Sequence, residues 1–310
     1  MALKTKVLVN RPNWETLRVV GCFICGSDLQ NMATARYSNI TPGHEVVAEK
    51  REGTECNLVT INPIIPCHRC KLCVRGEFRD CESKKSIGTD YPGGFAEYIQ
   101  APAWNIIRLH KTVSTYSAGL IEPLACSIRL YFDVIARVRF TRKILIIGDG
   151  PIGVLNHRIF STLGREKVLL VGKHKERMAY LGRHAEYKLA GDTSSDDFRG
   201  VDAIIVCSKS EDYLLNNINF IPRDTYIFLQ TRISDNAKRK LETAGIKVER
   251  AFAYRHEDFL LGSELINSGR LICEDLVSNE INLRDLPRFL NNPDSKSLFM
   301  KIFVRASTFL

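Results

Sequence analysis

The sequence contains no apolar run that approaches the ~20 residues needed to cross a bilayer, which excludes a membrane span. It also has no internal repeat, low-complexity tract or Pro- or Gly-rich linker. Its 45% hydrophobic and 25% charged residues are a globular balance, which argues against a disordered or fibrous protein. Because the first residues offer no cleavage-like site after their short apolar patch, we expect no signal peptide.

The net charge of +9 raises the question of a nucleic-acid partner. The basic residues are scattered among 35 acidic ones, and the densest clusters lie at residues 137–143 and 173–177. Neither cluster is interleaved with the aromatic side chains on which bases would stack. We therefore expect no nucleic-acid partner, and we interpret the first cluster as a solvated surface.

The first third of the 310-residue chain is rich in β-branched and turn residues and shows little helical periodicity. A length of 310 residues suggests two domains or one large one. We expect the first domain to be mainly β. Its predicted strands cover residues 4–10, 17–22, 44–50, 57–62 and 95–101.

The pattern changes from about residue 121 onward, where strands and helices alternate. Such alternation builds a parallel sheet with helices on both faces, so the predicted fold class is α/β. A final strand at 298–306 need not belong to that sheet. The predicted helices cover 122–138, 151–164 and 175–184, and the strands cover 143–150, 167–172, 202–208, 225–230 and 246–252.

Four of the ten cysteines lie close together, at Cys67, Cys70, Cys73 and Cys81. In a chain that is not exported, this clustering indicates a metal site more than disulfides, and it places the protein in the cytoplasm. Zinc takes four thiolates tetrahedrally, which leaves no open position, so the site would be structural. An iron–sulfur cluster needs similar spacing, but the charges between the cysteines disfavour it.

A glycine loop follows the apolar strand that begins at residue 143 and opens the next helix. In that context the pattern predicts a dinucleotide site, because the glycines allow a tight turn and a close approach of the pyrophosphate to the helix N-terminus. The residues concerned are Gly148, Gly150, Pro151, Ile152 and Gly153.

The end of the second predicted strand lacks the carboxylate that usually binds the ribose hydroxyls of NAD. Gly172 is followed instead by Lys173, His174 and Lys175. These residues can pair with a 2′-phosphate, and cations at the start of a helix oppose its dipole, which favours a functional role for them. We therefore predict NADP(H) rather than NAD(H).

A cysteine and a histidine of the β domain, together with a glutamate at the domain junction, could form a second metal site. Cys25, His44 and Glu122 would make a three-ligand catalytic zinc site whose fourth position is open. Each residue alone also fits an ordinary structural role, as a buried thiol, a turn histidine or a helix-starting glutamate.

Taken together, the chain resembles the zinc-dependent medium-chain alcohol and polyol dehydrogenases over nearly its whole length. The motifs that match do so in the expected order. They are Cys25-Gly26-Ser27-Asp28, Gly43-His44-Glu45, the four-cysteine loop, residues 93–98, Glu122-Pro123-Leu124, the glycine loop, residues 265–270 and Lys301-Ile302-Phe303-Val304.

This resemblance implies a GroES-like β domain at residues 1–122, completed by 262–310, and a Rossmann domain at 123–261. It implies two zinc ions per chain, with Cys25, His44 and Glu122 as ligands of the catalytic one. Glu45 would bond to that ligand set or exchange with one of its members. Ser27 would bond the substrate oxygen and begin the proton relay. Family members are commonly homodimers or homotetramers.

Three features set the chain apart from better-known members of this family. Gln30 stands where many members have a histidine that finishes the proton relay, so the proton must leave through another residue, water or the cofactor ribose. The segments around 51–60 and 192–201 are short, and basic residues replace the acidic cofactor residue.

The leading hypothesis is thus an NADP(H)-dependent zinc oxidoreductase that interconverts an alcohol, polyol or sugar and its ketone or aldehyde. Two alternatives stay open at this point. One is a carbonyl reductase of the same fold that needs no catalytic zinc. The other is a non-catalytic NADP(H)-binding zinc protein.

Overall fold

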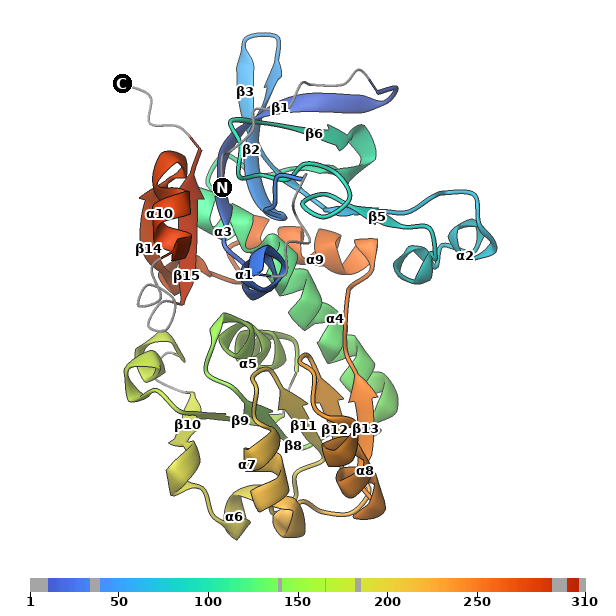
Figure 1. Cartoon of the computed structure of the whole chain (residues 1–310), viewed down its shortest axis with the longest axis vertical. Helices are drawn as coiled ribbons and strands as arrows, with labels where there is room; N and C mark the ends of the chain where they lie inside the picture. The colour runs from blue at the N-terminus through green and yellow to red at the C-terminus, as the bar shows by residue number, and fades with distance from the viewer. Residues whose placement is uncertain are drawn as a thin grey trace. The chain divides into compact units, whose positions relative to one another are not determined.

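A computed structural model describes residues 11–33, 40–138, 141–164, 166–181, 185–291 and 300–306. The chain forms two compact units, Met1–Ala125 with Arg255–Leu310 and Cys126–Tyr254 (Figure 1). The sequence placed the two boundaries after residues 122 and 261. The predicted strand at 4–10 lies outside the described residues.

The first unit is built on a twisted sheet of mainly antiparallel strands, in which seven described strands pair. The order is β14-β15-β1-β2-β3-β7, and β6 pairs with the first half of β1, Trp14–Arg18. The strands are β1 (Trp14–Phe23), β2 (Glu45–Glu52), β3 (Glu55–Ile61), β6 (Tyr98–Pro102), β7 (Ile106–Arg108), β14 (Val277–Asn282) and β15 (Lys301–Arg305).

The C-terminal strand β15 is part of this first sheet. It lies antiparallel to β1, with Gly21 opposite Arg305 and Phe23 opposite Phe303 (Figure 1). Alternating residues of both strands enter one core, including Leu17, Val19, Ile302 and Val304. The last segment of the chain therefore completes the domain that the first segment begins.

Short helices and loops surround the sheet of the first unit. The helices are α1 (Gly26–Ala33), α2 (Lys71–Val74), α3 (Thr115–Gly119), α9 (His256–Asn267) and α10 (Leu286–Asn291). The four-cysteine loop contains α2 and the 3-10 turn η1 (Phe78–Asp80), and it is closed by the strand pair β4 (Ile64–Ile65) and β5 (Lys85–Ser86).

The second unit contains a parallel sheet of six described strands in the order β10-β9-β8-β11-β12-β13. Its strands are near-continuous apolar runs because both faces are buried. They are β8 (Lys143–Ile147), β9 (Lys167–Gly172), β10 (Glu186–Leu189), β11 (Ala203–Val206), β12 (Tyr226–Leu229) and β13 (Lys247–Arg250). This is the strand order of a Rossmann sheet, and the predicted α/β fold class is confirmed.

The helices of the second unit connect these parallel strands. They are α4 (Ile121–Arg137), which begins in the first unit, α5 (Pro151–Leu163), α6 (Ser195–Phe198), α7 (Glu211–Asn216) and α8 (Asp235–Thr243). The segment Lys175–Leu181 forms tight 3-10 turns where the sequence predicted an α-helix, beginning with the bond from the Arg177 N–H to the His174 carbonyl. Among the described residues, no helix is long and apolar enough to span a bilayer.

Replacing Gly21 by alanine tests the close contact between β1 and β15. The added Cβ would lie 2.1 Å from the Phe303 ring, so we expect the free energy of unfolding to fall by about 2 kcal/mol. Denaturant unfolding followed by circular dichroism measures this. The matched control is Gly191→Ala, which meets nothing within 4 Å and should change stability by less than about 0.5 kcal/mol. Equal effects would contradict the proposed contact.

Candidate metal and cofactor sites

Three side chains of the first unit converge on one point. Cys25 follows β1, while His44 and Glu45 lie at the start of β2. Because Phe23 pairs with Glu45 across these strands, the two motifs become neighbours. One ligand atom from each of the three residues lies within 4.8 Å of the others. A thiolate, an imidazole and a carboxylate can hold a zinc ion and leave its fourth position open.

Asp28 contacts two of these three residues, Cys25 and His44. Its buried carboxylate accepts a hydrogen bond of 3.1 Å from the Cys25 N–H and lies 3.4 Å from Nδ1 of His44. A carboxylate in this position fixes the orientation of a metal-binding imidazole. Burial alone would lower the pKa of His44, but the Cys25 thiolate and the bond to Asp28 raise it well above its usual value.

Glu45 is neutralised by Lys301, which arrives on β15 from the far end of the chain. The ammonium nitrogen of Lys301 lies 2.5 Å from both carboxylate oxygens, and both side chains are buried, at 4% and 0% exposure. Burial by itself would lower the pKa of Lys301, but the charges of Glu45 and then of Cys25 raise it. The pair therefore buries two opposite charges against each other beside Cys25 and His44.

Glu122 and Ser27, both assigned from the sequence, occupy different positions. Glu122 is buried in the first turn of α4 and is not part of the group of three, although its charge also raises the pKa of Lys301. The carboxylate that lies with Cys25 and His44 is that of Glu45. Ser27 is exposed in α1, two residues after Cys25, and the side chain of Gln30 lies outside the described residues.

The four sulfur atoms of Cys67, Cys70, Cys73 and Cys81 lie within 4.8 Å of one another. Backbone N–H groups point at them, from Cys73 to the Cys70 sulfur and from Cys67 to the Cys81 sulfur, each at 3.4 Å. Bonds from the backbone N–H groups of Arg69 and Cys70 lower the pKa of the Cys67 thiol to about 6. Four sulfur atoms held this closely fit a divalent metal with tetrahedral preference.

In the second unit, the glycine loop has the geometry that a dinucleotide requires. Gly148 has a φ of +123°, and a Cβ on Gly153 would lie 1.8 Å from the Gly148 carbonyl oxygen. Gly150 caps α5 without a side chain and has nothing within 4 Å of where its Cβ would be. The turn is therefore tight, while the space beside the helix N-terminus is open to a pyrophosphate.

A cavity of about 220 Å³ lies beside this loop, at the carboxyl ends of β8, β9 and β11. Ligands of parallel sheets bind at this edge, where the strand order reverses. Of the predicted cofactor residues, those that line the cavity are Gly148, Gly150, Gly172, Lys173 and His174. Pro151, Ile152 and Gly153 form the first turn of α5, and Lys175 is exposed away from the cavity lining.

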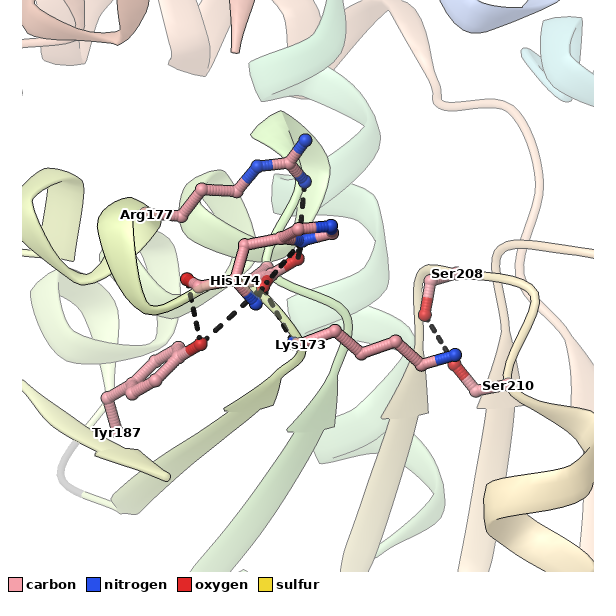
Figure 2. A network of polar contacts seen from close by, with 7 residues as sticks. Lys173, His174, Arg177, Tyr187, Ser208 and Ser210 are labelled. Atoms are coloured by element: carbon pink, nitrogen blue, oxygen red, sulfur yellow. Dashed lines mark hydrogen bonds and ion pairs between the residues drawn. The ribbon is translucent and has the colours of Figure 1, made fainter. Parts of the chain in front are cut away.

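Several residues that line the cavity were not identified from the sequence. They come from the start of η3 (Lys175–Leu181), from the segment after β11 and from α7, and they are Arg177, Ser208, Lys209, Ser210 and Tyr213. Figure 2 shows Lys173 extending toward Ser208 and Ser210, whose hydroxyl groups bond to each other. No motif marks these residues, because only strand pairing brings the end of β11 beside the glycine loop.

Asp149, in the middle of the glycine loop, was also missed. Its carboxylate is 5% exposed and accepts hydrogen bonds from the residues that follow β9. Burial alone would raise its pKa, but the backbone and side chain of His174 lower it below the usual value. The loop and the basic segment are thus joined through one carboxylate.

Residues 11–111 match the family model of the alcohol dehydrogenase GroES-like domain. The chain is 25% identical to D-arabinitol dehydrogenase 1 of Uromyces fabae over 317 residues, covering 93% of this chain and 89% of that protein. It is 24% identical to the probable D-xylulose reductase A of Aspergillus clavatus over 294 residues, covering 84% and 81%.

Together these matches support a zinc-type medium-chain dehydrogenase/reductase. A solved structure from Sinorhizobium meliloti 1021, assigned as a zinc-binding dehydrogenase and bound to NADP, has the same fold. It superposes with a TM-score of 0.78 at 20% identity, covering 96% of this chain and 93% of that one. The comparisons therefore support an oxidoreductase of the alcohol dehydrogenase family.

The pairing of Lys301 with Glu45 can be tested by Lys301→Met. Leaving a buried carboxylate without its cation should lower the free energy of unfolding by about 3 kcal/mol. In the double variant with Glu45→Gln no buried charge is left, so most of that loss should be recovered. The control is Lys247→Met, which breaks the exposed pair with Asp224 and should cost under about 1 kcal/mol. Additive losses in the double variant would show that the two residues do not interact.

Proposed function

We propose that this dehydrogenase uses zinc and NADP(H) to interconvert an alcohol of polyol or sugar type and its ketone or aldehyde. The observation that carries the proposal is the convergence of Cys25, His44 and Glu45 in the same chain as a dinucleotide cavity. Such a set of ligand atoms is unnecessary in a carbonyl reductase that works without zinc. The names of the two polyol-directed relatives support the substrate class.

When bound, zinc would supply Lewis acidity at the substrate oxygen and NADP(H) would donate or accept the hydride. Cys25, His44 and Glu45 would hold the metal, with Asp28 orienting His44 and Lys301 pairing with Glu45. Glu122 is an alternative carboxylate ligand. Its charge raises the pKa of Lys301, the residue that pairs with Glu45, which supports this alternative.

Ser27 would accept the proton of the substrate alcohol, since it is an exposed hydroxyl two residues from Cys25. Gln30 cannot take that proton further, because an amide does not titrate in the physiological range. The proton would then leave through water or through the ribose hydroxyls of the cofactor. The other metal site, at Cys67, Cys70, Cys73 and Cys81, would hold a second zinc with a structural role.

The preference for NADP(H) follows from the charges around the cavity. Lys173, Arg177 and Lys209 contribute three positive charges and Asp149 one negative charge, which leaves an excess of two for a 2′-phosphate dianion. Among the described residues, no ion pair engages Lys173, so its ammonium group can meet an anion. We further propose a homodimer or homotetramer, as is common in this family.

Metal content measured by plasma mass spectrometry on wild type and Cys25→Ser tests the metal assignment. We expect two zinc ions per chain in the wild type and one in the variant, with NADPH-dependent ketone reduction reduced at least about 100-fold, because the Lewis acid is lost. The control is Cys56→Ser, an exposed thiol that belongs to neither metal group and should keep both zinc ions and the activity. One zinc in both wild type and Cys25→Ser would refute the catalytic metal site.

Lys173→Ala tests the cofactor assignment. Loss of one cation beside the 2′-phosphate should weaken NADPH binding about tenfold and leave NADH binding within about twofold. Quenching of protein fluorescence on titration with each cofactor measures both. The control is Lys167→Ala, which removes an exposed cation at the opposite end of β9. An equal loss for both cofactors in Lys173→Ala would contradict a role for this residue in phosphate recognition.

A further inference from the structure

Asp149 accepts from five donors, four of which belong to the segment after β9. Its Oδ2 accepts from the backbone N–H of Lys173 at 2.8 Å and of His174 at 2.7 Å. Its Oδ1 lies 3.2 Å from Nη1 of Arg177, and both oxygens lie 3.1 Å from Nδ1 of His174. The hydroxyl of Tyr187 adds a longer bond of 3.5 Å and also donates to the His174 carbonyl at 3.1 Å.

Gly172, at the end of β9, leaves room for this carboxylate. A Cβ on Gly172 would lie 2.5 Å from both the Cβ and Oδ2 of Asp149. Gly172 is not among the residues with positive φ, so its backbone does not require glycine. Gly172 and Asp149 are distant in sequence, but the lack of a side chain at Gly172 is what allows Asp149 to lie against it.

The usual carboxylate at the end of β9 is absent here, and Asp149 supplies one from the neighbouring loop. Five protein donors already contact its two oxygens, which makes it a poor acceptor for a ribose hydroxyl. The backbone of Lys173 is fixed against Asp149, while its side chain extends across the cavity toward Ser208 and Ser210 (Figure 2). His174, Arg177 and Tyr187 instead contact the Asp149 carboxylate itself.

We propose that Asp149 is the positioning residue for recognition of the cofactor's 2′-phosphate. It clamps the segment from Lys173 to Arg177 against the glycine loop, and so holds Lys173 at the cavity. This inference rests on the NADP(H) part of the proposed function. It adds that the preference for NADP(H) depends on Asp149, an acidic residue of the glycine loop. Asp149 acts through the basic residues that it anchors.

The inference makes a prediction opposite to that of simple electrostatics. A negative charge beside a phosphate site repels the phosphate, so neutralising it should tighten binding if charge alone mattered. If anchoring dominates, neutralising it should weaken binding, because the basic segment is no longer held. Glu176 offers a matched comparison, since it is an exposed acid in the same segment that lies outside the Asp149 network.

The experiment is isothermal titration calorimetry of 2′,5′-ADP and 5′-AMP with the full-length wild type, Asp149→Asn and Glu176→Gln. The two ligands differ only in the 2′-phosphate, so the ratio of their dissociation constants isolates its recognition. We expect Asp149→Asn to bind 2′,5′-ADP about tenfold more weakly and 5′-AMP within about twofold. Glu176→Gln should bind 2′,5′-ADP at least as tightly as wild type.

Gly172→Ala provides a second test of the same contact. Its added methyl group would displace the Asp149 carboxylate, although residue 149 is still an aspartate. It should show the same selective loss for 2′,5′-ADP, and a thermal unfolding scan checks that each variant is folded. Unchanged or tighter binding of 2′,5′-ADP by Asp149→Asn would overturn the inference. So would an equal loss for both ligands in folded protein, because that would mark a purely structural role in the glycine loop.

The wild-type titration separates the NADP(H) assignment from the role of Asp149. Preference for 2′,5′-ADP in wild type together with an unaffected Asp149→Asn sinks the inference and leaves the NADP(H) assignment standing. Equal binding of the two ligands by wild type removes the NADP(H) assignment and the inference with it. The zinc measurement on Cys25→Ser is independent of either result.

Discussion

The buried ion pair of Lys301 and Glu45 joins the last strand of the first unit, β15, to β2 beside Cys25 and His44. Neither charge could be buried alone, since an unpaired ion in an apolar environment costs several kcal/mol. The pair therefore requires β15 to lie beside β1 and β2 to present Glu45 on the other side. The strand order of the sheet and the geometry of the Cys25, His44 and Glu45 group are consequences of one constraint.

Close backbone approaches serve the chemistry in both units. Gly43, with a φ of +101°, comes so near the Cys22 sulfur and the Phe95 N–H that a Cβ would lie 2.9 and 3.0 Å from them. This turn positions His44 beside Cys25 and Glu45. Gly153 and Gly172 play the corresponding parts around the cofactor cavity, where one packs a helix on its loop and the other accommodates Asp149. At each of these glycines, the absence of a side chain leaves space for a neighbouring residue or backbone segment of the site.

Much of the fold could be predicted because the signals are local. Apolar runs that end in the glycine loop or in turn residues identified five of the six strands of the parallel sheet, and the predicted family membership is confirmed. Strand β10 was missed, since it is short, lies at the sheet edge and mixes charged with apolar residues. The segment after β9 was predicted to be α-helical. Its actual 3-10 turns begin where side-chain and backbone bonds to Asp149 hold its first residues.

By itself, the sequence determined the cysteine cluster, the dinucleotide loop and the motif order, because each depends on residues close together in the chain. The tertiary structure alone decided that Glu45 lies with Cys25 and His44, that Lys301 neutralises it, and that Ser208 and Lys209 line the same cavity as Lys173. These contacts join residues that are far apart in sequence. Strand pairing and the cost of burying unpaired charge select them, and neither leaves a periodic or spaced pattern in the sequence.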